Sequence, residues 1–354
     1  MDELAADPMI EFVFVGRKFA MEGDHHISAE YALMKERGVS FLPIIAGRLQ
    51  RTYTAQTIPA LLKVPIGCVQ AMLYCLRERP SLIVSFGGYV SLPVALAGWL
   101  LHIPVITHEQ TLAPGLANKL IERMSTRVCV TFAETLHRFA KDKAVLTGLP
   151  MRSELFTSTR EAPYSADEKK YPIVYITGGS TGAHSLNMLL FPIIAELVKK
   201  YTVIHQTGAY SMQTATTVHH GLPVSDRKRY VPCEFIPLHT LSWILKHAKF
   251  VIGRSGANTT MELAALGKVA ILVPLPWSAG NEQLLQARWL STHGGAVVVE
   301  QDAVRRNTLM HHILEIGTSY EALRRRAETF AKTIPRDGTA RLAKEILRNL
   351  PASI

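Results

Sequence analysis

Two glycine-rich turns in the second half of the sequence carry residue types that bind phosphate. The first is "YITGGSTGAHSLN" at 175–187, where an apolar run ends in a turn and a helical pattern begins. Gly179 and Ser180 lie at its centre, so the backbone can approach a ligand closely while the first amides of the helix point toward the turn. The spacing is neither that of a dinucleotide-binding GxGxxG loop nor that of a Walker A loop. It predicts a phosphate or diphosphate site, and a tight structural turn is the alternative.

The second turn, "VIGRSGANTTMELAALG" at 251–267, repeats this design and adds a carboxylate. Glu262 follows the first helical turn, and an ionised carboxylate can accept two hydroxyls of a sugar. A glutamate at a helix start with no ligand fits the spacing equally well. The next loop and helix, at 273–287, add polar side chains suited to sugar hydroxyls, namely Glu282, Gln283 and Gln286.

The first half has two similar loops, "SFGGYVSLP" at 85–93 and "THEQTLAPGLANK" at 107–119. His108 and Glu109 resemble a general base pair. Adjacent residues at a strand end usually point to different faces, so the alternative is that both side chains brace the loop.

These loops require strands and helices that position them. Short β-branched runs alternate with amphipathic helices such as 28–38, in two series separated by a polar segment at 158–171 that reads as a linker. Such alternation predicts parallel βαβ units and two α/β, Rossmann-like, doubly wound domains with a cleft between them. The predicted strands are 11–16, 40–45, 82–86, 104–108, 127–131, 143–148, 171–179, 201–208, 230–236, 250–256, 269–275 and 295–300. A last helix over about 338–349 is predicted to be N-capped by Asp337.

The composition is that of a globular, basic protein. The chain has 354 residues, a formal net charge of +10 and four cysteines without a CxxC pair, which argues against a disulfide framework or a zinc site. The longest apolar stretch, at 90–106, is too short to cross a bilayer. The segment 57–81 combines apolar and basic residues and predicts an interfacial surface for anionic lipid. The alternative is that most of these side chains pack under the sheet. Its apolar members are Leu61, Leu62, Val64, Ile66, Met72 and Leu76, and its basic members are Lys63, Arg77 and Arg79.

Six motifs in order make the chain resemble the MurG family of cell-wall glycosyltransferases. They are "FGGYVS", "HEQTLAPGLANK", "GGSTGA", "HQTG", "GRSGANTTMEL" and "PLPWSAGNEQLLQA". The resemblance implies a GT-B fold with an acceptor and membrane-binding domain at 1–150 and a UDP-sugar-binding domain at 151–336. It also implies that a helix at 337–354 packs back on the first domain.

The resemblance also implies substrates and site residues. The donor would be UDP-N-acetylglucosamine and the acceptor an undecaprenyl-linked muramoyl-pentapeptide, at the cytoplasmic face of the cell membrane and with no nucleic-acid partner. Gly179 and Ser180 would hold the diphosphate, Ile236 the uracil, Glu262 the ribose and Gln283 the N-acetylglucosamine. The implied donor-binding residues are Arg152, Gly179, Ser180, Ile236, Ala257, Asn258, Thr259, Glu262 and Gln283. The implied acceptor-binding residues are Gly87, Gly88, Tyr89 and Asn118.

The mechanism implied is inverting transfer to the acceptor's 4-hydroxyl, without a tightly held metal, although Mg²⁺ in solution could stimulate it. The catalytic base is not identified, and His108 and Glu109 are its weak candidates. Four positions depart from the family's pattern, namely Thr111, Leu149, Glu282 and Gln286. The alternatives are another UDP-sugar transferase, an epimerase of the same fold, or a UDP-sugar-binding protein inactivated by truncation.

The opening "MDELAADPMIEFVFVG" at 1–16 resembles the end of a helix followed by the second strand of the family's fold. Family members begin with a strand and a glycine-rich loop that carries histidine. We therefore expect that Met1 is an internal methionine, that the first strand and the loop with the base are missing, and that the first sheet has a gap.

Overall fold

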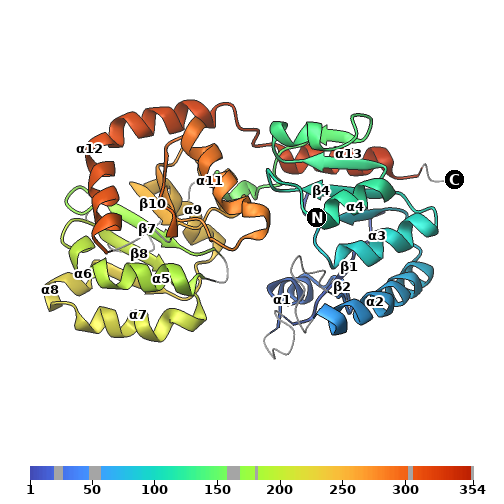
Figure 1. Ribbon diagram of the computed structural model, residues 1–354, viewed down its shortest axis with the longest axis horizontal. Coiled ribbons are helices and arrows are strands. Elements are labelled where there is room, and N and C mark those ends of the chain that lie inside the picture. The colour runs from blue at the N-terminus through green and yellow to red at the C-terminus, as the bar shows by residue number, and fades with distance from the viewer. Residues whose placement is uncertain (20–26, 48–56, 158–167, 180–181, 302–305, 352–354) are drawn as a thin grey trace. The chain divides into compact units, whose positions relative to one another are not determined.

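The computed structural model describes residues 1–19, 27–47, 57–157, 168–179, 182–301 and 306–351 (Figure 1). Contacts divide the chain into two compact units. Unit 1 comprises Met1–Pro150 and Asp337–Ile354, and unit 2 comprises Met151–Arg336.

Unit 2 is built on a six-stranded parallel sheet with the order β12-β11-β10-β7-β8-β9. The chain adds β8 and β9 on one side of β7 and then returns to add β10, β11 and β12 on the other side, so β7 and β10 flank the switch point of the sheet. Thr177 at the end of β7 pairs with Gly253 at the end of β10. The strands are β7 (Ile173–Thr177), β8 (Thr202–Gln206), β9 (Tyr230–Cys233), β10 (Phe250–Gly253), β11 (Ala270–Leu272) and β12 (Ala296–Val298).

Helices cover both faces of this sheet, because alternate strand residues face two separate cores. Val174 and Ile176 pack with residues of α5, α6 and α12, whereas Ile173 and Tyr175 pack with residues of α9, α10 and α11. The helices are α5 (His184–Leu190), α6 (Ile194–Leu197), α7 (Ala209–Gly221), α8 (Val224–Arg227), α9 (Leu238–His247), α10 (Ala257–Leu266), α11 (Glu282–His293) and α12 (Arg306–Ala331). Short 3-10 turns lie at η2 (Ser153–Leu155), η3 (Phe191–Ile193) and η4 (Ala279–Asn281).

Unit 1 holds its described strands in two parallel sheets. One has the order β3-β4-β5-β6 and the other pairs β1 with β2. The strands are β1 (Val13–Gly16), β2 (Ser40–Pro43), β3 (Ile83–Ser85), β4 (Val105–Glu109), β5 (Arg127–Val130) and β6 (Ala144–Leu146). The helices are α1 (Ala29–Glu36), α2 (Thr57–Glu78), α3 (Ser91–Leu100), α4 (Leu116–Met124) and α13 (Gly338–Asn349), with a 3-10 turn η1 (Ala133–Arg138). The expected strand upstream of Met1 stays a prediction.

The C-terminal helix α13 belongs to unit 1 (Figure 1). Leu342 packs against Ile106 of β4 and Cys129 of β5. Asp337 occupies the N-cap position, but its side chain does not cap the helix, so that part of the prediction is wrong. Its φ of −97° and ψ of 19° are not the extended values of a capping residue, and its carboxylate instead pairs with Arg341 at 2.9 Å.

The two-domain Rossmann-like fold predicted from the alternating pattern is confirmed. Each of the twelve predicted strand segments overlaps an observed strand, and the predicted helix at 28–38 is α1 with Ser28 accepting from the amide of Tyr31 at 3.2 Å. The predicted linker at 158–171 lies mostly outside the described residues.

Candidate functional site

The carboxyl edge of the unit 2 sheet holds the first glycine turn directly after β7. Gly179 has a φ of +90°, and a Cβ at this position would meet nothing within 4 Å, so the backbone borders open space. Its amide donates to Thr177 Oγ1 at 3.1 Å and its carbonyl accepts from Gln206 Nε2 at 3.1 Å. Gly182 packs so closely on the next loop that a Cβ would lie 2.4 Å from the carbonyl oxygen of Thr207. The turn is therefore held by β7 and β8 while Gly179 stays accessible. Ser180, predicted here, lies outside the described residues.

The second glycine turn lies beside the first, because β10 is the neighbour of β7. A Cβ on Gly253 would lie 2.9 Å from the carbonyl oxygen of Thr177. Gly256 precedes α10 in open space. In the first turn of α10, Asn258 is exposed, whereas Ala257 and Thr259 are half-buried.

Glu262 on α10 is a carboxylate whose pKa is strongly raised. Burial raises its pKa from the ordinary 4.5 to about 7, and the positive charge of Arg152 acts in the opposite direction. No other described residue donates a hydrogen bond to it. A half-buried carboxylate without protein donors has free acceptor sites for hydroxyl groups. Arg152 itself is exposed, just before η2.

Gln283 at the start of α11 is tied to both neighbouring loops. Its Oε1 accepts from the amide of Leu275 at 3.0 Å, and its carbonyl accepts from Ser255 Oγ at 2.8 Å. The side-chain amide nitrogen of Gln283 remains as a donor for a ligand. Gln286, one turn later, is only 1% exposed and both of its amide atoms lack a partner among the described residues. Gln286 thus lies inside the fold in this structure.

Ile236 follows β9, and its side chain is buried in the core with Trp243 and Ile244. The side chain therefore cannot lie flat against a base. The predicted contact between Ile236 and uracil stays a prediction, and it would have to be made by the amide and carbonyl of this residue.

The corresponding edge of unit 1 carries Gly87 and Gly88, both with a φ near +80°. A Cβ on Gly87 would lie 2.7 Å from Asn118 Nδ2, whereas Gly88 faces open space. Tyr89 is half-buried, with the Arg17 guanidinium 5.6 Å from its ring centroid. Gly88 and Tyr89 are thus accessible to a ligand.

Asn118 and Glu109 form a buried brace behind that edge. Asn118 Nδ2 donates to Glu109 Oε2 at 2.8 Å, and its Oδ1 accepts from Thr107 at 3.1 Å. Glu109 also accepts from the amide and hydroxyl of Thr111, at 2.9 and 2.7 Å, and from the amide of Gly115 at 3.2 Å. Thr111 is one of the four departures from the family's pattern, and its contacts complete this brace.

His108 and Glu109 do not form a general base pair in this structure. His108 is fully buried, its Nε2 lies 3.0 Å from the carbonyl oxygen of Gly148, and burial lowers its pKa to about 4. Glu109 is 3% exposed and its carboxylate is occupied by protein donors. The structure favours the alternative in which both residues brace the loop.

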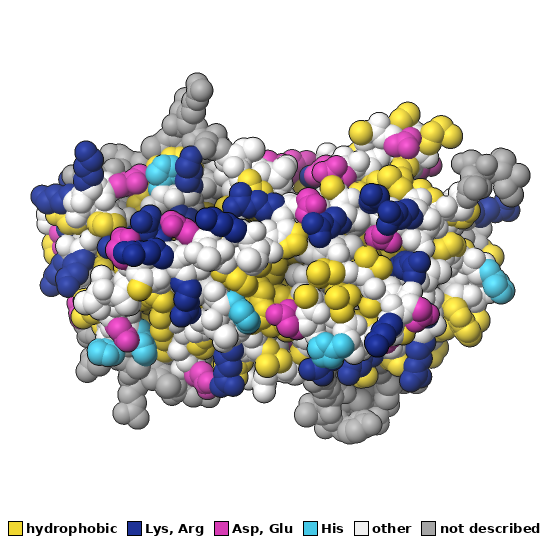
Figure 2. Space-filling view, turned by 90° about the horizontal axis from the view of Figure 1, so that it is seen from above, with side chains coloured by type: hydrophobic (Ala, Val, Ile, Leu, Met, Phe, Trp, Pro, Cys, Tyr) yellow, Lys and Arg dark blue, Asp and Glu magenta, His cyan; other side chains and the backbone are white. Residues whose placement is uncertain are grey.

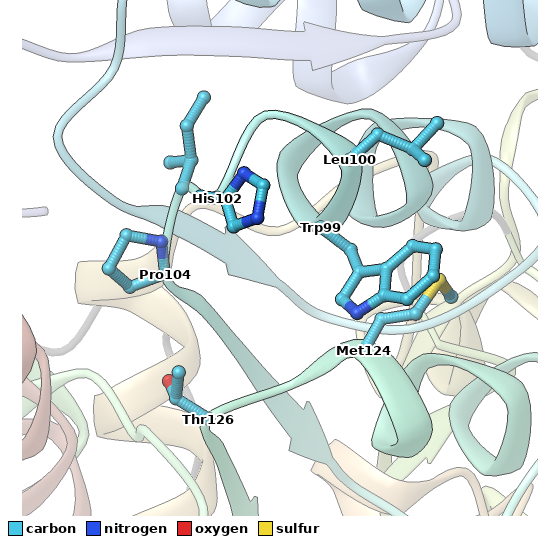
Figure 3. A pocket seen from close by; sticks show the side chains of 7 residues that line it. Trp99, Leu100, His102, Pro104, Met124 and Thr126 are labelled. Carbon is cyan, nitrogen blue, oxygen red and sulfur yellow. The ribbon is translucent and has the colours of Figure 1, made fainter.

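A separate cavity of about 400 Å³ lies at the opposite edge of the unit 1 sheet, where β4 and β5 begin (Figure 3). Figure 3 shows Trp99 beside Met124. The cavity is lined by Trp99, Leu100, His102, Ile103, Pro104, Met124 and Thr126. It is therefore distinct from the loops at the carboxyl edge.

Two further features concern metals and membranes. Within the described ranges, no three His, Cys, Asp or Glu side chains gather where they could hold a metal ion. No described helix has the length and apolar character needed to cross a membrane.

Two Rossmann-like units with glycine loops at the carboxyl edges of their sheets have the arrangement of the GT-B fold. The glycosyltransferase family 28 N-terminal domain matches residues 24–130, and the C-terminal domain of the same family matches residues 173–342. The chain belongs to glycosyltransferase family 28, and within it to the MurG family.

Relatives at moderate identity carry one enzyme name. The UDP-N-acetylglucosamine–N-acetylmuramyl-(pentapeptide) pyrophosphoryl-undecaprenol N-acetylglucosamine transferase of Clostridium tetani is 34% identical over 284 residues, covering 79% of this chain and 77% of the relative. The enzyme of the same name from Treponema pallidum is 33% identical, covering 81% and 76%.

Solved structures support the fold. The crystal structure of Acinetobacter baumannii MurG has a TM-score of 0.71 at 23% identity, covering 98% of this chain and 93% of that one. A UDP-N-acetylglucosamine 2-epimerase has a TM-score of 0.64 at 12% identity, covering 99% and 93%. At these identities the likeness concerns the fold alone.

Proposed function

We propose that the protein transfers N-acetylglucosamine from UDP-N-acetylglucosamine to an undecaprenyl-linked muramoyl-pentapeptide. The names of its relatives support this substrate pair. The observation that carries the proposal is Glu262, a carboxylate with a raised pKa and no described donor, beside two adjacent glycine turns. A ligand with a diol next to a diphosphate would meet both of these features, since the diol can bind the carboxylate and the diphosphate can bind the glycine turns. A nucleoside diphosphate sugar is such a ligand.

The donor occupies unit 2 in this proposal. The diphosphate lies at Gly179, Ser180 and the start of α10 at Ala257, Asn258 and Thr259, where backbone amides and the helix dipole favour negative charge. Glu262 accepts the two ribose hydroxyls, and Arg152 adds a positive charge nearby.

The sugar and base ends of the donor meet different elements. The main chain of Ile236 meets the uracil edge, and Gln283 Nε2 is the donor available to the sugar. The acceptor lies along Gly87, Gly88 and Tyr89 of unit 1, with the side chain of Asn118 close behind Gly87.

The reaction proposed is a single displacement with inversion. The acceptor's 4-hydroxyl oxygen forms a bond to the anomeric carbon, the bond from that carbon to the β-phosphate oxygen breaks, and the hydroxyl proton passes to a base. The negative charge that develops on UDP is stabilised by the amides of the two turns, so alignment and charge stabilisation supply the catalysis.

The direct test is release of UDP from UDP-N-acetylglucosamine with and without a lipid-linked acceptor. We expect release that depends on the acceptor. An isomerised sugar formed without acceptor would identify an epimerase, and binding without turnover would identify a nucleotide-sugar-binding protein; either result would overturn the transferase proposal.

We also propose peripheral binding to anionic membranes through α2. Four apolar side chains, which we call the α2 stripe, are between 49% and 60% exposed: Ile66, Val69, Leu73 and Leu76. Their spacing places them along one face of the helix. Arg77 and Arg79 lie at its C-terminal end and are exposed, and Arg77 forms an ion pair with Glu78 at 2.6 Å. An exposed apolar row with cations at its end suits a bilayer surface.

Other residues predicted to belong to this membrane-binding surface are not part of the exposed α2 stripe. Met72 is half-buried and packs on the unit 1 core, so it supports the helix instead. The side chains of Leu61, Leu62 and Lys63 lie outside the described residues. Trp99 and Leu100 at the end of α3, which contacts α2, are exposed apolar residues that the sequence reasoning missed. Figure 2 shows many lysine and arginine side chains at the surface, in keeping with the net charge of +10.

Sedimentation with vesicles tests this surface. Binding to anionic vesicles should exceed binding to neutral ones and should fall with salt, because attraction between basic side chains and headgroups is screened. The double change Val69→Ser and Leu73→Ser should weaken binding to both kinds of vesicle. Leu314→Ser, at an exposed apolar residue of α12, is the matched control. An equal loss of vesicle binding in the control, or no loss in the double variant, would exclude the α2 stripe as the membrane-binding surface.

A further inference from the structure

Arg254 lies in the turn between β10 and α10 and is 5% exposed. Its guanidinium joins four segments of unit 2. Nη1 donates to the carbonyl oxygens of Val273 and Pro274, at 2.9 and 3.2 Å, directly after β11. Nη2 donates to Ser185 Oγ in the first turn of α5 at 2.7 Å and to Gln301 Oε1 beyond β12 at 2.6 Å.

All four acceptors of Arg254 are neutral. Among the residues that the structure describes, no carboxylate pairs with this guanidinium, and its Nε lacks a partner altogether. Burial lowers its pKa to about 10, so the group stays charged at neutral pH. An unpaired buried cation costs folding free energy, and a neutral side chain could brace the same carbonyls at a lower cost. Costs of this kind are tolerated chiefly at functional sites.

The position of Arg254 links the charge to the two glycine turns. Its amide donates to the carbonyl oxygen of Thr177 at 3.3 Å, the residue before Gly178 and Gly179. Ser185 belongs to the helix that follows the first turn, and Arg254 itself lies between Gly253 and Gly256 in the second turn. Arg254 therefore contacts the first turn through its main-chain amide and the helix after that turn through its side chain, and it places a positive charge behind both turns.

We propose that Arg254 is a positioning residue for the donor's diphosphate. It fixes the two glycine turns relative to each other, and its charge has no carboxylate partner among the described residues, so a diphosphate bound at the same edge of the sheet would supply the negative charge. This inference rests on the proposed donor site in unit 2, and it adds a residue that acts from beneath the turns.

Gln301→Glu tests the charge while keeping the arginine. The new carboxylate oxygen takes the position of Oε1, where it accepts the same hydrogen bond and neutralises the guanidinium. We expect an unchanged or higher melting temperature together with UDP affinity at least fivefold lower and unchanged uridine affinity. A purely structural role predicts no such loss.

Arg254→Gln and Arg254→Lys complete the series, with calorimetric titration of UDP and uridine as the readout. The contribution of the diphosphate is given by the dissociation constant of uridine divided by that of UDP. This ratio should fall about tenfold or more in Arg254→Gln and should be largely kept in Arg254→Lys, which retains the charge. Arg326→Gln is the control, since Arg326 also donates to a main-chain carbonyl, that of Gly294 at 2.6 Å, but lies on α12.

The outcomes separate this proposal from the proposed function. If the unchanged protein binds no UDP, the donor site itself is wrong. If it binds UDP and Gln301→Glu leaves the ratio of uridine to UDP dissociation constants unchanged, the role of Arg254 is overturned, even where Arg254→Gln fails to fold.

Discussion

Glu109 and Glu262 are two glutamates near the carboxyl edges of parallel sheets, one in each unit, and they differ in what surrounds the carboxylate. Glu109 is buried and accepts hydrogen bonds from Thr111, Gly115 and Asn118. Glu262 is half-buried, has no described donor, and has its pKa raised to about 7 by burial.

This difference separates structural from functional carboxylates. A carboxylate whose acceptor sites are filled by protein donors holds a loop together and has nothing left for a ligand. A desolvated carboxylate without donors is costly in the free protein and gains most when a ligand supplies hydroxyls. The comparison therefore predicts different responses to the same substitution. Alanine at Glu109 should lower the stability of the fold, and alanine at Glu262 should lower the affinity for UDP.

Glu109→Ala should give the largest effect, a loss of about 3–5 kcal/mol in the free energy of unfolding. Four hydrogen-bond donors lose their acceptor, and each unsatisfied buried group costs about 1 kcal/mol or more. Urea unfolding followed by circular dichroism measures the loss. UDP affinity should stay unchanged, because the proposed donor site lies in unit 2.

Glu122→Ala is the control for that experiment, since Glu122 accepts from a single backbone amide, that of Ala140. Its cost should be only about 1 kcal/mol. Equal costs for the two substitutions would show that the brace around Glu109 is not a cooperative unit.

Glu262→Ala should weaken UDP binding by roughly 1–3 kcal/mol, as expected when hydrogen bonds to a charged group are lost. Calorimetric titration at pH 8, where the carboxylate is ionised, gives the value. Glu321→Ala on α12 removes an exposed carboxylate of the same unit and should leave affinity unchanged. Wild-type affinity in Glu262→Ala would remove this residue from the site.

The raised pKa of Glu262 predicts how stability and binding depend on pH. Because its folded-state pKa of about 7 exceeds the ordinary 4.5, the folded protein binds the proton more tightly, and stability falls as pH rises from about 4.5 to 7. Glu262→Gln should abolish this fall, so the variant should be more stable than the wild type at pH 8 by about 1–2 kcal/mol, after allowing for partial exposure.

UDP binding should change in the opposite sense. Wild-type affinity should rise between pH 6 and pH 8 as Glu262 ionises, more steeply than in Glu262→Gln, whose remaining slope reports the ionisation of UDP itself. Parallel pH profiles for the two proteins, in melting temperature and in affinity, would contradict the raised pKa.

The sequence was sufficient for the fold because its signals are local. Each predicted strand is a short β-branched run bounded by turn residues, and both glycine turns follow such a run directly. The site was less predictable because its chemistry depends on distant partners. Arg254 meets Ser185 and Gln301, which are 69 and 47 residues away in sequence, and nothing in the local pattern indicates those contacts.

Burial explains the remaining differences. The motif around His108 and Glu109 has the residue types of a base pair, but only the three-dimensional structure shows that both side chains are enclosed. Likewise Ile236 is positioned by its motif, while its side chain belongs to the core. Residue type predicts which chemistry is available, and accessibility decides whether a ligand can meet it.

Asp337 offers a third carboxylate that tests whether burial or hydrogen bonding matters more in this comparison. It accepts from Arg341 Nε at 2.9 Å, yet both side chains are about half exposed. An exposed ion pair of this spacing on a helix contributes only about 0.3–0.5 kcal/mol, because water screens the charges and two side chains lose freedom. Asp337→Ala should therefore change the free energy of unfolding by no more than that, and the change should shrink in high salt.

Arg341→Ala should give the same small value, and the double variant should not exceed either single one by much. A loss above about 1 kcal/mol would mean that Asp337 supports the start of α13 in solution despite its non-capping geometry.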